Sequence, residues 1–343
     1  MNPLLNNIFE QPTELKKVLR SLQNEYQSDV YVVAETLKKA DRIILSSMGS
    51  AYYSMIPMYY ALNRQGKNVR LEETAELLRN KDKLEDAVYI LMSRSGESYE
   101  VAALAQVLKE KGLCCISITM TPDSTMAKNS SHVLYDCSSY DDLVCTKAYT
   151  SLALCGLVCS TVMEKGCLPE SMAMTLEEMF DWMENNKKAI QSSIETIEGL
   201  RETNGFYCIS RSVGMGVIQS ASLWIEEETK KCCGYMSIDN FYHGPVEVVS
   251  SGTLPIFLAV QPDSRSEMIW DCICKNAGTA LYIGPEGRNP ENCTVLNYPL
   301  FQLDAEYIML MQALFFQLLA YQCAAASGVV PGKFDVLSCW VVK

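Results

Sequence analysis

Most of this sequence follows one order of elements: an apolar strand, a short turn that contains glycine or serine, and a helix. In the first half the expected strands are four apolar runs, at residues 42–46, 87–92, 113–119 and 132–136. The helices expected after them reach Leu62, cover 99–111, follow Pro122 and cover 143–163. Strands that are apolar along their whole length and alternate with helices favour a parallel sheet with helices on both faces.

The same order returns about 165 residues later, an interval typical of a duplicated domain and too long for a solenoid repeat. The second set of strands is expected at 206–210, 254–260, 279–284 and 294–298, before a closing apolar helix at 305–326. We expect the charged segment 169–203 to form a helical hairpin between the two sets. The expected boundaries are an N-terminal helical segment at 1–40, a first domain at 41–165, a helical connector at 166–203, a second domain at 204–328 and a C-terminal tail at 329–343.

The run Ser93-Arg94-Ser95-Gly96-Glu97-Ser98, called the hydroxyl loop below, points to a ligand. It follows an apolar strand and precedes the helix at 99–111. A helix start offers unpaired N–H groups and a partial positive charge, glycine lets backbone approach a ligand closely, and serine hydroxyls add donors. In parallel sheets, ligands bind beyond the carboxyl ends of the strands. The hydroxyl loop therefore predicts a phosphate site, with a serine-rich helix cap as the alternative.

Charge and hydropathy exclude two classes of partner. The formal net charge is −12, from 29 basic and 41 acidic side chains. A chain this acidic is a poor candidate for non-specific binding of nucleic acid or of an anionic membrane. The apolar stretch 308–330 contains three glutamines, so we expect a buried or interface helix and no membrane span.

The 15 cysteines and two histidines lack the spacing of a metal site. The cysteines stand as adjacent pairs, as Cys272-x-Cys274 and as single residues, with no Cys-x-x-Cys pair. We therefore expect free thiols that act as small apolar side chains, no metal, no cofactor, and a reduced, cytoplasmic protein.

Two units of this kind, each with a glycine-containing turn after its first strand, resemble the sugar isomerase (SIS) domain. The resemblance rests on residues 48–52, 93–98 and 146–150 and on the His-Gly-Pro element within 241–247. The chain is similar to the isomerase half of glucosamine-6-phosphate synthase, to the fructoselysine-6-phosphate deglycases and to the amino-sugar-phosphate deaminase/isomerases. This implies an α/β fold of two tandem SIS domains, each a flavodoxin- or Rossmann-like three-layer sandwich.

The resemblance also implies roles for particular residues. The family's phosphate and sugar ligands correspond to Gly49, Ser50, Ser93, Arg94, Ser95, Gly96 and Ser98. Its proton-transfer base corresponds to Glu227, 16 residues before the ring-opening histidine, which corresponds to His243. In relatives this histidine reaches into the neighbouring subunit's site, which implies a homodimer or a higher oligomer with shared sites.

The sequence departs from the family pattern at several positions. Ala51 lacks a second hydroxyl in the sugar-holding turn, and Trp224 stands where the synthase has a lysine. Lys333 lies near the synthase's C-terminal lysine but in another register. Amine transfer as the synthase performs it is therefore not expected. Lys147 stands at a helix start, and the sequence allows two roles for it: a structural one, or one in which it faces the phosphate.

Each catalytic assignment has a structural alternative. Glu227 lies in a run of three glutamates, and such runs are usually solvated helix faces. A lone histidine is more often structural than catalytic, but the spacing of Glu227 to His243 and the Gly-Pro that follows favour catalysis. His132 is expected in the core or at the edge of a strand, and Gly214-x-Gly216 is too short for a dinucleotide fingerprint and predicts a tight turn.

The leading hypothesis is an enzyme that acts on the 6-phosphate of an amino sugar or of a glycated amine. It would couple aldose–ketose isomerisation to deamination or to deglycation, through a cis-enediol or enolamine. A partly buried carboxylate would move a proton between C1 and C2, and a histidine would open the sugar ring. The alternative is a non-catalytic regulatory protein that binds a sugar phosphate and has no need of the glutamate–histidine pair.

Overall fold

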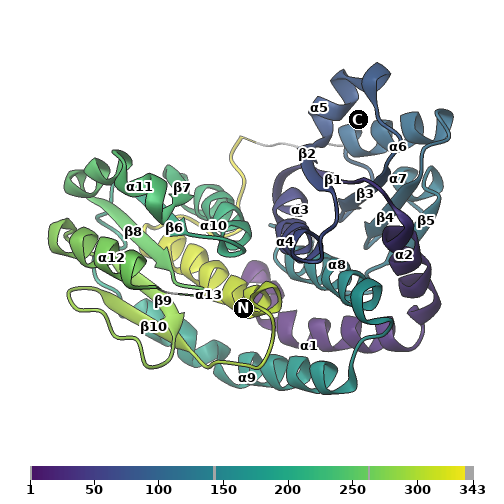
Figure 1. The fold of residues 1–343 in the computed structure, drawn as a ribbon. Helices are drawn as coiled ribbons and strands as arrows, with labels where there is room; N and C mark the ends of the chain where they lie inside the picture. The colour runs from purple at the N-terminus through teal and green to yellow at the C-terminus, as the bar shows by residue number, and fades with distance from the viewer. Residues whose placement is uncertain (1, 142–143, 262, 337–343) are drawn as a thin grey trace. The chain divides into compact units, whose positions relative to one another are not determined.

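The computed structural model describes residues 2–141, 144–261 and 263–336, which form two compact units (Figure 1). The first unit comprises Glu10–Asp181, and the second comprises Trp182–Phe334 with the N-terminal residues up to Phe9. Two long helices run across this division along the chain, α1 (Pro3–Gln23) and α9 (Glu170–Glu195). The domain boundaries expected from the sequence stay predictions.

In its described part, the first unit has one parallel sheet in the order β2-β1-β3-β4-β5. Its strands are β1 (Ile43–Ser47), β2 (Val69–Glu73), β3 (Val88–Ser93), β4 (Cys115–Thr119) and β5 (His132–Tyr135). Its helices are α2 (Gln27–Lys39), α3 (Gly49–Ser54), α4 (Ile56–Arg64), α5 (Thr74–Arg79), α6 (Tyr99–Glu110), α7 (Thr125–Lys128) and α8 (Lys147–Lys165), with a 3-10 turn at Lys81–Lys83.

Helices cover both faces of this sheet. Tyr89 and Leu91 of β3 pack against Leu104 of α6, in a cluster that also includes residues of α5 and α7. Met92, which points to the opposite face, lies beside Gly156 of α8. The helices α2, α3 and α4 pack on α8 and form that second layer. The three-layer α/β arrangement predicted from the apolar strands is confirmed.

The second unit repeats this architecture in its described part, with a parallel sheet in the order β10-β9-β8-β6-β7. Its strands are β6 (Gly205–Ser210), β7 (Cys233–Ser237), β8 (Thr253–Leu258), β9 (Leu281–Pro285) and β10 (Thr294–Tyr298). Its helices are α10 (Gly214–Thr229), α11 (Ile238–Tyr242), α12 (Ser264–Asn276) and α13 (Ala305–Ala326), with a 3-10 segment at Pro245–Ser251. Phe257 packs with α11 and α12 on one face, while α10 and α13 pack together.

The sequence analysis missed one strand in each unit. Both β2 and β7 are edge strands with partly exposed residues, whereas β1, β3 and β4 are buried along their whole length. An edge strand faces water and lacks the continuous apolar run that identifies a central strand.

The prediction of a helical hairpin at 169–203 is wrong. Residues 170–195 form the single helix α9, which has no break between its charged turns. The helix expected at 143–163 begins at Lys147 as α8, and Leu143 lies outside the described residues, as does the part of the expected tail at 337–343. The apolar helix at the end of the second repeat is α13, with the predicted bounds.

Of the described helices, α13 alone is long and apolar enough to cross a membrane. In its most apolar window 83% of the residues are buried, and a core helix passes the same test of length and composition. Gln312 is fully buried there and donates a hydrogen bond to the Tyr298 hydroxyl at 2.8 Å. The burial expected for this helix is confirmed.

Gly96 fits the hydroxyl loop against the start of α7. Its φ is +63°, and a Cβ added at this position would lie 2.0 Å from Ser124 Oγ. The Gly96 carbonyl also accepts a hydrogen bond from Met126 N–H at 3.0 Å. Glycine is therefore required here by backbone conformation and by close packing together.

We expect Gly96→Ala to destabilise the protein by about 2–4 kcal/mol, the sum of left-handed backbone strain and overpacking. The matched control is Gly66→Ala, since Gly66 has φ +76° with open space around it and should show only the strain. Urea unfolding of both variants measures the difference. Equal losses in the two variants would show that the contact with Ser124 costs nothing.

Candidate functional site

The hydroxyl loop and the turn at Gly49 lie at the same edge of the first sheet. Ser93 ends β3, and Gly49 and Ser50 begin α3 directly after β1, which pairs with β3 in parallel. The chain leaves β1 toward β2 on one side, and β3 lies on the other side of β1. The carboxyl ends of β1 and β3 are therefore the topological switch point, where open α/β sheets bind ligands.

The hydroxyl loop is held by its own serines. Ser93 Oγ accepts a hydrogen bond from Gly96 N–H at 3.0 Å, and Ser95 Oγ accepts one from Glu97 N–H at 3.2 Å. Ser98 is the N-cap residue of α6, and its side chain does not cap the helix. Accepting these bonds does not use the hydroxyl protons of Ser93 and Ser95.

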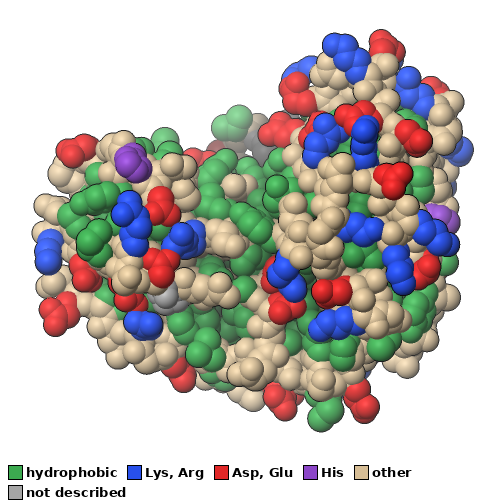
Figure 2. Space-filling model, in the orientation of Figure 1, with side chains coloured by type: hydrophobic (Ala, Val, Ile, Leu, Met, Phe, Trp, Pro, Cys, Tyr) green, Lys and Arg blue, Asp and Glu red, His purple; other side chains and the backbone are tan. Residues whose placement is uncertain are grey.

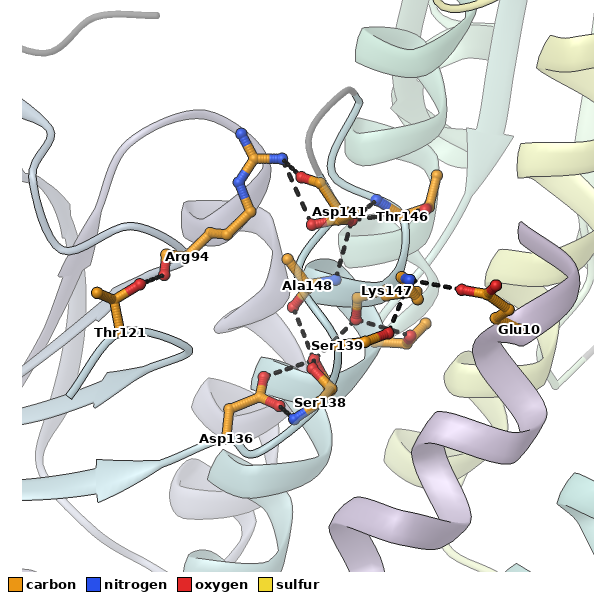
Figure 3. A network of polar contacts seen from close by, with 12 residues as sticks. Glu10, Arg94, Thr121, Asp136, Ser138, Ser139, Asp141, Thr146, Lys147 and Ala148 are labelled. Atoms are coloured by element: carbon orange, nitrogen blue, oxygen red, sulfur yellow. Dashed lines mark hydrogen bonds and ion pairs between the residues drawn. The ribbon is translucent and has the colours of Figure 1, made fainter. Parts of the chain in front are cut away.

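The Arg94 side chain points toward the segment before α8 (Figure 3). Its guanidinium donates to the Asp141 backbone carbonyl at 2.5 Å, lies 3.4 Å from the Asp141 carboxylate, and stands over the Tyr140 ring at 5.1 Å. The contact of Arg94 with phosphate that the resemblance implies stays a prediction. What the geometry provides is a brace between the hydroxyl loop and residues 140–141.

Asp141 completes this brace. Its carboxylate is fully buried and accepts N–H bonds from Thr146 at 2.7 Å and from Ala148 at 3.2 Å, at the start of α8. Burial raises the pKa of Asp141, while the Arg94 charge and these N–H donors lower it. The residue thus ties the first turn of α8 to the hydroxyl loop.

Lys147 has structural partners. Its ammonium is buried and lies 2.7 Å from the Glu10 carboxylate of α1 and 2.8 Å from Ser139 Oγ (Figure 3). Glu14 of α1 also accepts a bond from Ser139 N–H at 2.7 Å. Helix α1 therefore holds the segment that carries Asp141, a connection that the sequence analysis did not identify.

Asp136 is a second buried carboxyl in this network, and burial raises its pKa to about 7. The Ser151 hydroxyl has one proton, and its two nearest acceptors are Asp136 Oδ2 at 2.5 Å and the Lys147 carbonyl at 2.8 Å. A protonated Asp136 satisfies both, because it donates to Ser151 and frees Ser151 to donate to the carbonyl.

The second unit carries Glu227 and His243. Glu227 is partly buried in the last turn of α10, between exposed Glu226 and buried Glu228. His243 follows α11 directly and is exposed, with its backbone N–H bonded to the Asn240 carbonyl at 3.0 Å. Trp224, at the position of the synthase lysine, is a core residue with 1% of its surface exposed.

The loop after β8 in the second unit is a helix cap. Asp263 accepts N–H bonds from Arg265 at 3.0 Å and Ser266 at 2.9 Å in a capping box of α12. Arg211, which follows β6, pairs with Asp263 and lies 3.6 Å from Asp239. The carboxyl edge of this sheet is therefore occupied by internal ion pairs.

Lys333 lies in a short segment, residues 331–334, that contacts α10. Its backbone carbonyl accepts a bond from Lys230 Nζ at 2.7 Å. Among the described residues, no cluster of histidine, cysteine and acidic side chains could hold a metal ion. On the face drawn in Figure 2, basic and acidic side chains are interspersed, without a continuous basic patch.

Asp136 gives the protein a specific pH dependence. A carboxyl whose pKa is raised on folding costs stability as the pH rises from its ordinary value to the raised one. We expect Asp136→Asn to gain up to about 4 kcal/mol relative to wild type between pH 4 and 8. Urea unfolding at several pH values measures this, with exposed Asp86→Asn as the control. Parallel curves for wild type and Asp136→Asn would contradict it.

Comparison with known proteins identifies relatives of this chain. Residues 36–154 match the family described as SIS domain. The isomerizing glutamine–fructose-6-phosphate aminotransferase of Sulfurisphaera tokodaii is 23% identical over 341 residues, which cover 96% of this chain and 54% of that protein. The chain spans about half the length of the curated relatives it matches.

Two solved structures share the fold over nearly their whole length. Glucosamine-6-phosphate deaminase from Thermotoga maritima superposes with a TM-score of 0.80 at 23% identity, covering 98% of both chains. Tagatose-6-phosphate ketose/aldose isomerase from Escherichia coli superposes with a TM-score of 0.83 at 18% identity, covering 98% of this chain and 96% of that one. Residues 36–154 therefore match the SIS domain, and the chain as a whole has the same α/β fold of two parallel sheets as these two proteins.

Proposed function

We propose that this protein is a phosphosugar enzyme that moves a proton between C1 and C2 of an amino-sugar or glycated-amine 6-phosphate and then releases the amine. The observation that carries the proposal is the hydroxyl loop beside the Gly49–Ser50 turn at the switch point of the first sheet. The Glu227 and His243 pair adds the acid–base groups that such a reaction needs.

The proposed phosphate contact relies on N–H and hydroxyl donors. Arg94 and Lys147, the two cations of the neighbouring network, are paired with Asp141 and Glu10. The serine hydroxyls and the first turn of α6 are then the groups that meet the anion. Binding the phosphate there fixes the position of the reacting carbons without touching them.

The proposed chemistry balances without a cofactor. His243 assists ring opening, and Glu227 removes a proton from one of the two carbons and returns it to the other through an enolamine. The resulting imine takes up water, which breaks the C–N bond and releases the amine and a sugar phosphate. Glu227 is partly buried, and a positioned carboxylate can take up a proton and return it.

The relatives support the substrate class. Their names refer to fructose 6-phosphate, glucosamine 6-phosphate and tagatose 6-phosphate, which are all hexose 6-phosphates. The buried Trp224 at the synthase lysine position favours deamination or deglycation over amine transfer. We further propose a cytoplasmic homodimer, or a higher oligomer, in which His243 serves the site of the neighbouring subunit.

We expect Glu227→Gln to lower turnover of such phosphates by about 10²- to 10⁴-fold, because it removes the proton-transfer group. The control is Glu226→Gln, one residue away on the exposed side of α10. Assays in D₂O with glucosamine 6-phosphate and fructoselysine 6-phosphate report both amine release and deuterium at C1 or C2. A wild type that is stabilised by these phosphates but never exchanges deuterium would favour the regulatory, non-catalytic alternative.

Shared sites predict complementation between inactive variants. Co-expressed Glu227→Gln and His243→Ala chains should form mixed oligomers that recover part of the turnover that each variant lacks alone. Differently tagged chains purified in two affinity steps isolate these mixed oligomers for assay. If they stay as inactive as the two homo-oligomers, each subunit uses its own histidine.

A further inference from the structure

Segment 331–334 is fastened to the second unit by contacts from separate parts of that unit. Gly332 N–H donates to Glu228 Oε2 at 2.6 Å, and Lys230 Nζ donates to the Lys333 carbonyl at 2.7 Å. The Lys230 ammonium also lies 5.4 Å from the centre of the Phe334 ring. On the other side, Asn2 Nδ2 donates to the Pro331 carbonyl at 3.1 Å.

Glu228 is an unusual anchor for this segment. Only 2% of its surface is exposed, and among the described residues its Oε1 has no hydrogen-bond partner. A neutral carboxyl tolerates such a position at modest cost, whereas an anion with a buried, unpartnered oxygen is much less stable. The anchor is therefore compatible with the closed segment mainly while it carries a proton.

We propose that Glu228 is a positioning residue that clasps segment 331–334 against the end of α10 when it is protonated and releases the segment when it ionises. The catalytic meaning of this clasp rests on the proposed function, because the clasp joins the helix turn that bears Glu227 to the segment that bears Lys333. The clasp itself is a property of the chain that can be measured without a substrate.

The charges around Glu228 set the direction of this effect. Burial raises its pKa to about 7, while the Gly332 N–H and the Lys230 charge lower it. Lys333 is the charged residue of the segment itself, and Asp335 follows the segment. Glu226 and Glu227 are the charged residues beside Glu228 on α10, and the adjoining α13 carries one charged residue, Glu306, in its first turn. Of these charged groups, Lys230 is the cation whose charge lowers the pKa of Glu228.

Proton linkage determines whether the closed segment becomes more or less stable as the pH rises. Because the closed state raises the pKa of Glu228, the ratio of closed to open segment is highest at acid pH. It falls as the pH rises toward the raised value and levels off above it, with a total change on the order of 10²-fold. Between pH 6 and 8 the expected fall is about 10-fold.

Hydrogen–deuterium exchange of the full chain at pH 6, 7 and 8, corrected for intrinsic exchange rates, tests the clasp. Protection of the amides of residues 331–334 should fall about 10-fold in the wild type over this range. Glu228→Gln, which keeps an acceptor for Gly332 N–H but has no charge, should show no such fall. The matched control is Asp136→Asn, a buried carboxyl in the first unit, which should behave as the wild type does in this segment.

The pH dependence of exchange in the wild type needs no variant, so it tests the clasp even if Glu228→Gln folds poorly. Lys230→Gln gives a second check, because loss of the cation should move the fall in protection to higher pH. Constant wild-type protection, or the same fall in Glu228→Gln, would overturn the clasp. Neither result depends on turnover, so failure of the clasp and failure of the proposed function are distinguishable.

Discussion

The Asp141 carboxylate is the interaction on which the candidate phosphate site depends. It accepts N–H bonds from the start of α8 and meets the Arg94 guanidinium of the hydroxyl loop. Both partners are held in a buried environment, where a charge needs its counter-charge and its hydrogen bonds together. Removing one partner would leave the other buried and unpaired, so the loop geometry and the position of α8 are coupled.

The central strands could be predicted because each is a run of consecutive apolar residues, the pattern of a strand that is buried on both faces. The edge strands β2 and β7 could not, since β2 reads Val-Arg-Leu-Glu-Glu and its side chains alternate between neighbours and water. The connector showed the opposite error, since a hairpin was expected where one helix forms. Charged residues at helical spacing also suit the solvent face of one long amphipathic helix, and α9 is such a helix, with Leu176, Met179 and Phe180 buried on its other face.

The site was predictable in its local part and not in its long-range part. Ser93, Gly96 and Ser98 form one loop in sequence and in space, so their pattern is visible directly. The partners of Arg94 and Lys147 are 47 and 137 residues away, and no local pattern connects them. For the same reason the run Glu226-Glu227-Glu228 looked uniform, although successive helix positions point about 100° apart and place the three side chains in three environments.

The two sheets show how a duplicated architecture can divide one task. At the carboxyl edge of the first sheet, the cation Arg94 pairs with Asp141, and in the proposed site it is the serine hydroxyls that meet the anion. At the same edge of the second sheet, Arg211, Asp239 and Asp263 pair with one another. In the proposed function, the second unit contributes instead the Glu227 carboxyl, which is partly buried on α10, and the His243 imidazole, which is exposed after α11. The proposed function thus assigns anion binding to the first unit and proton transfer to the second, and the two tasks need different electrostatic surroundings.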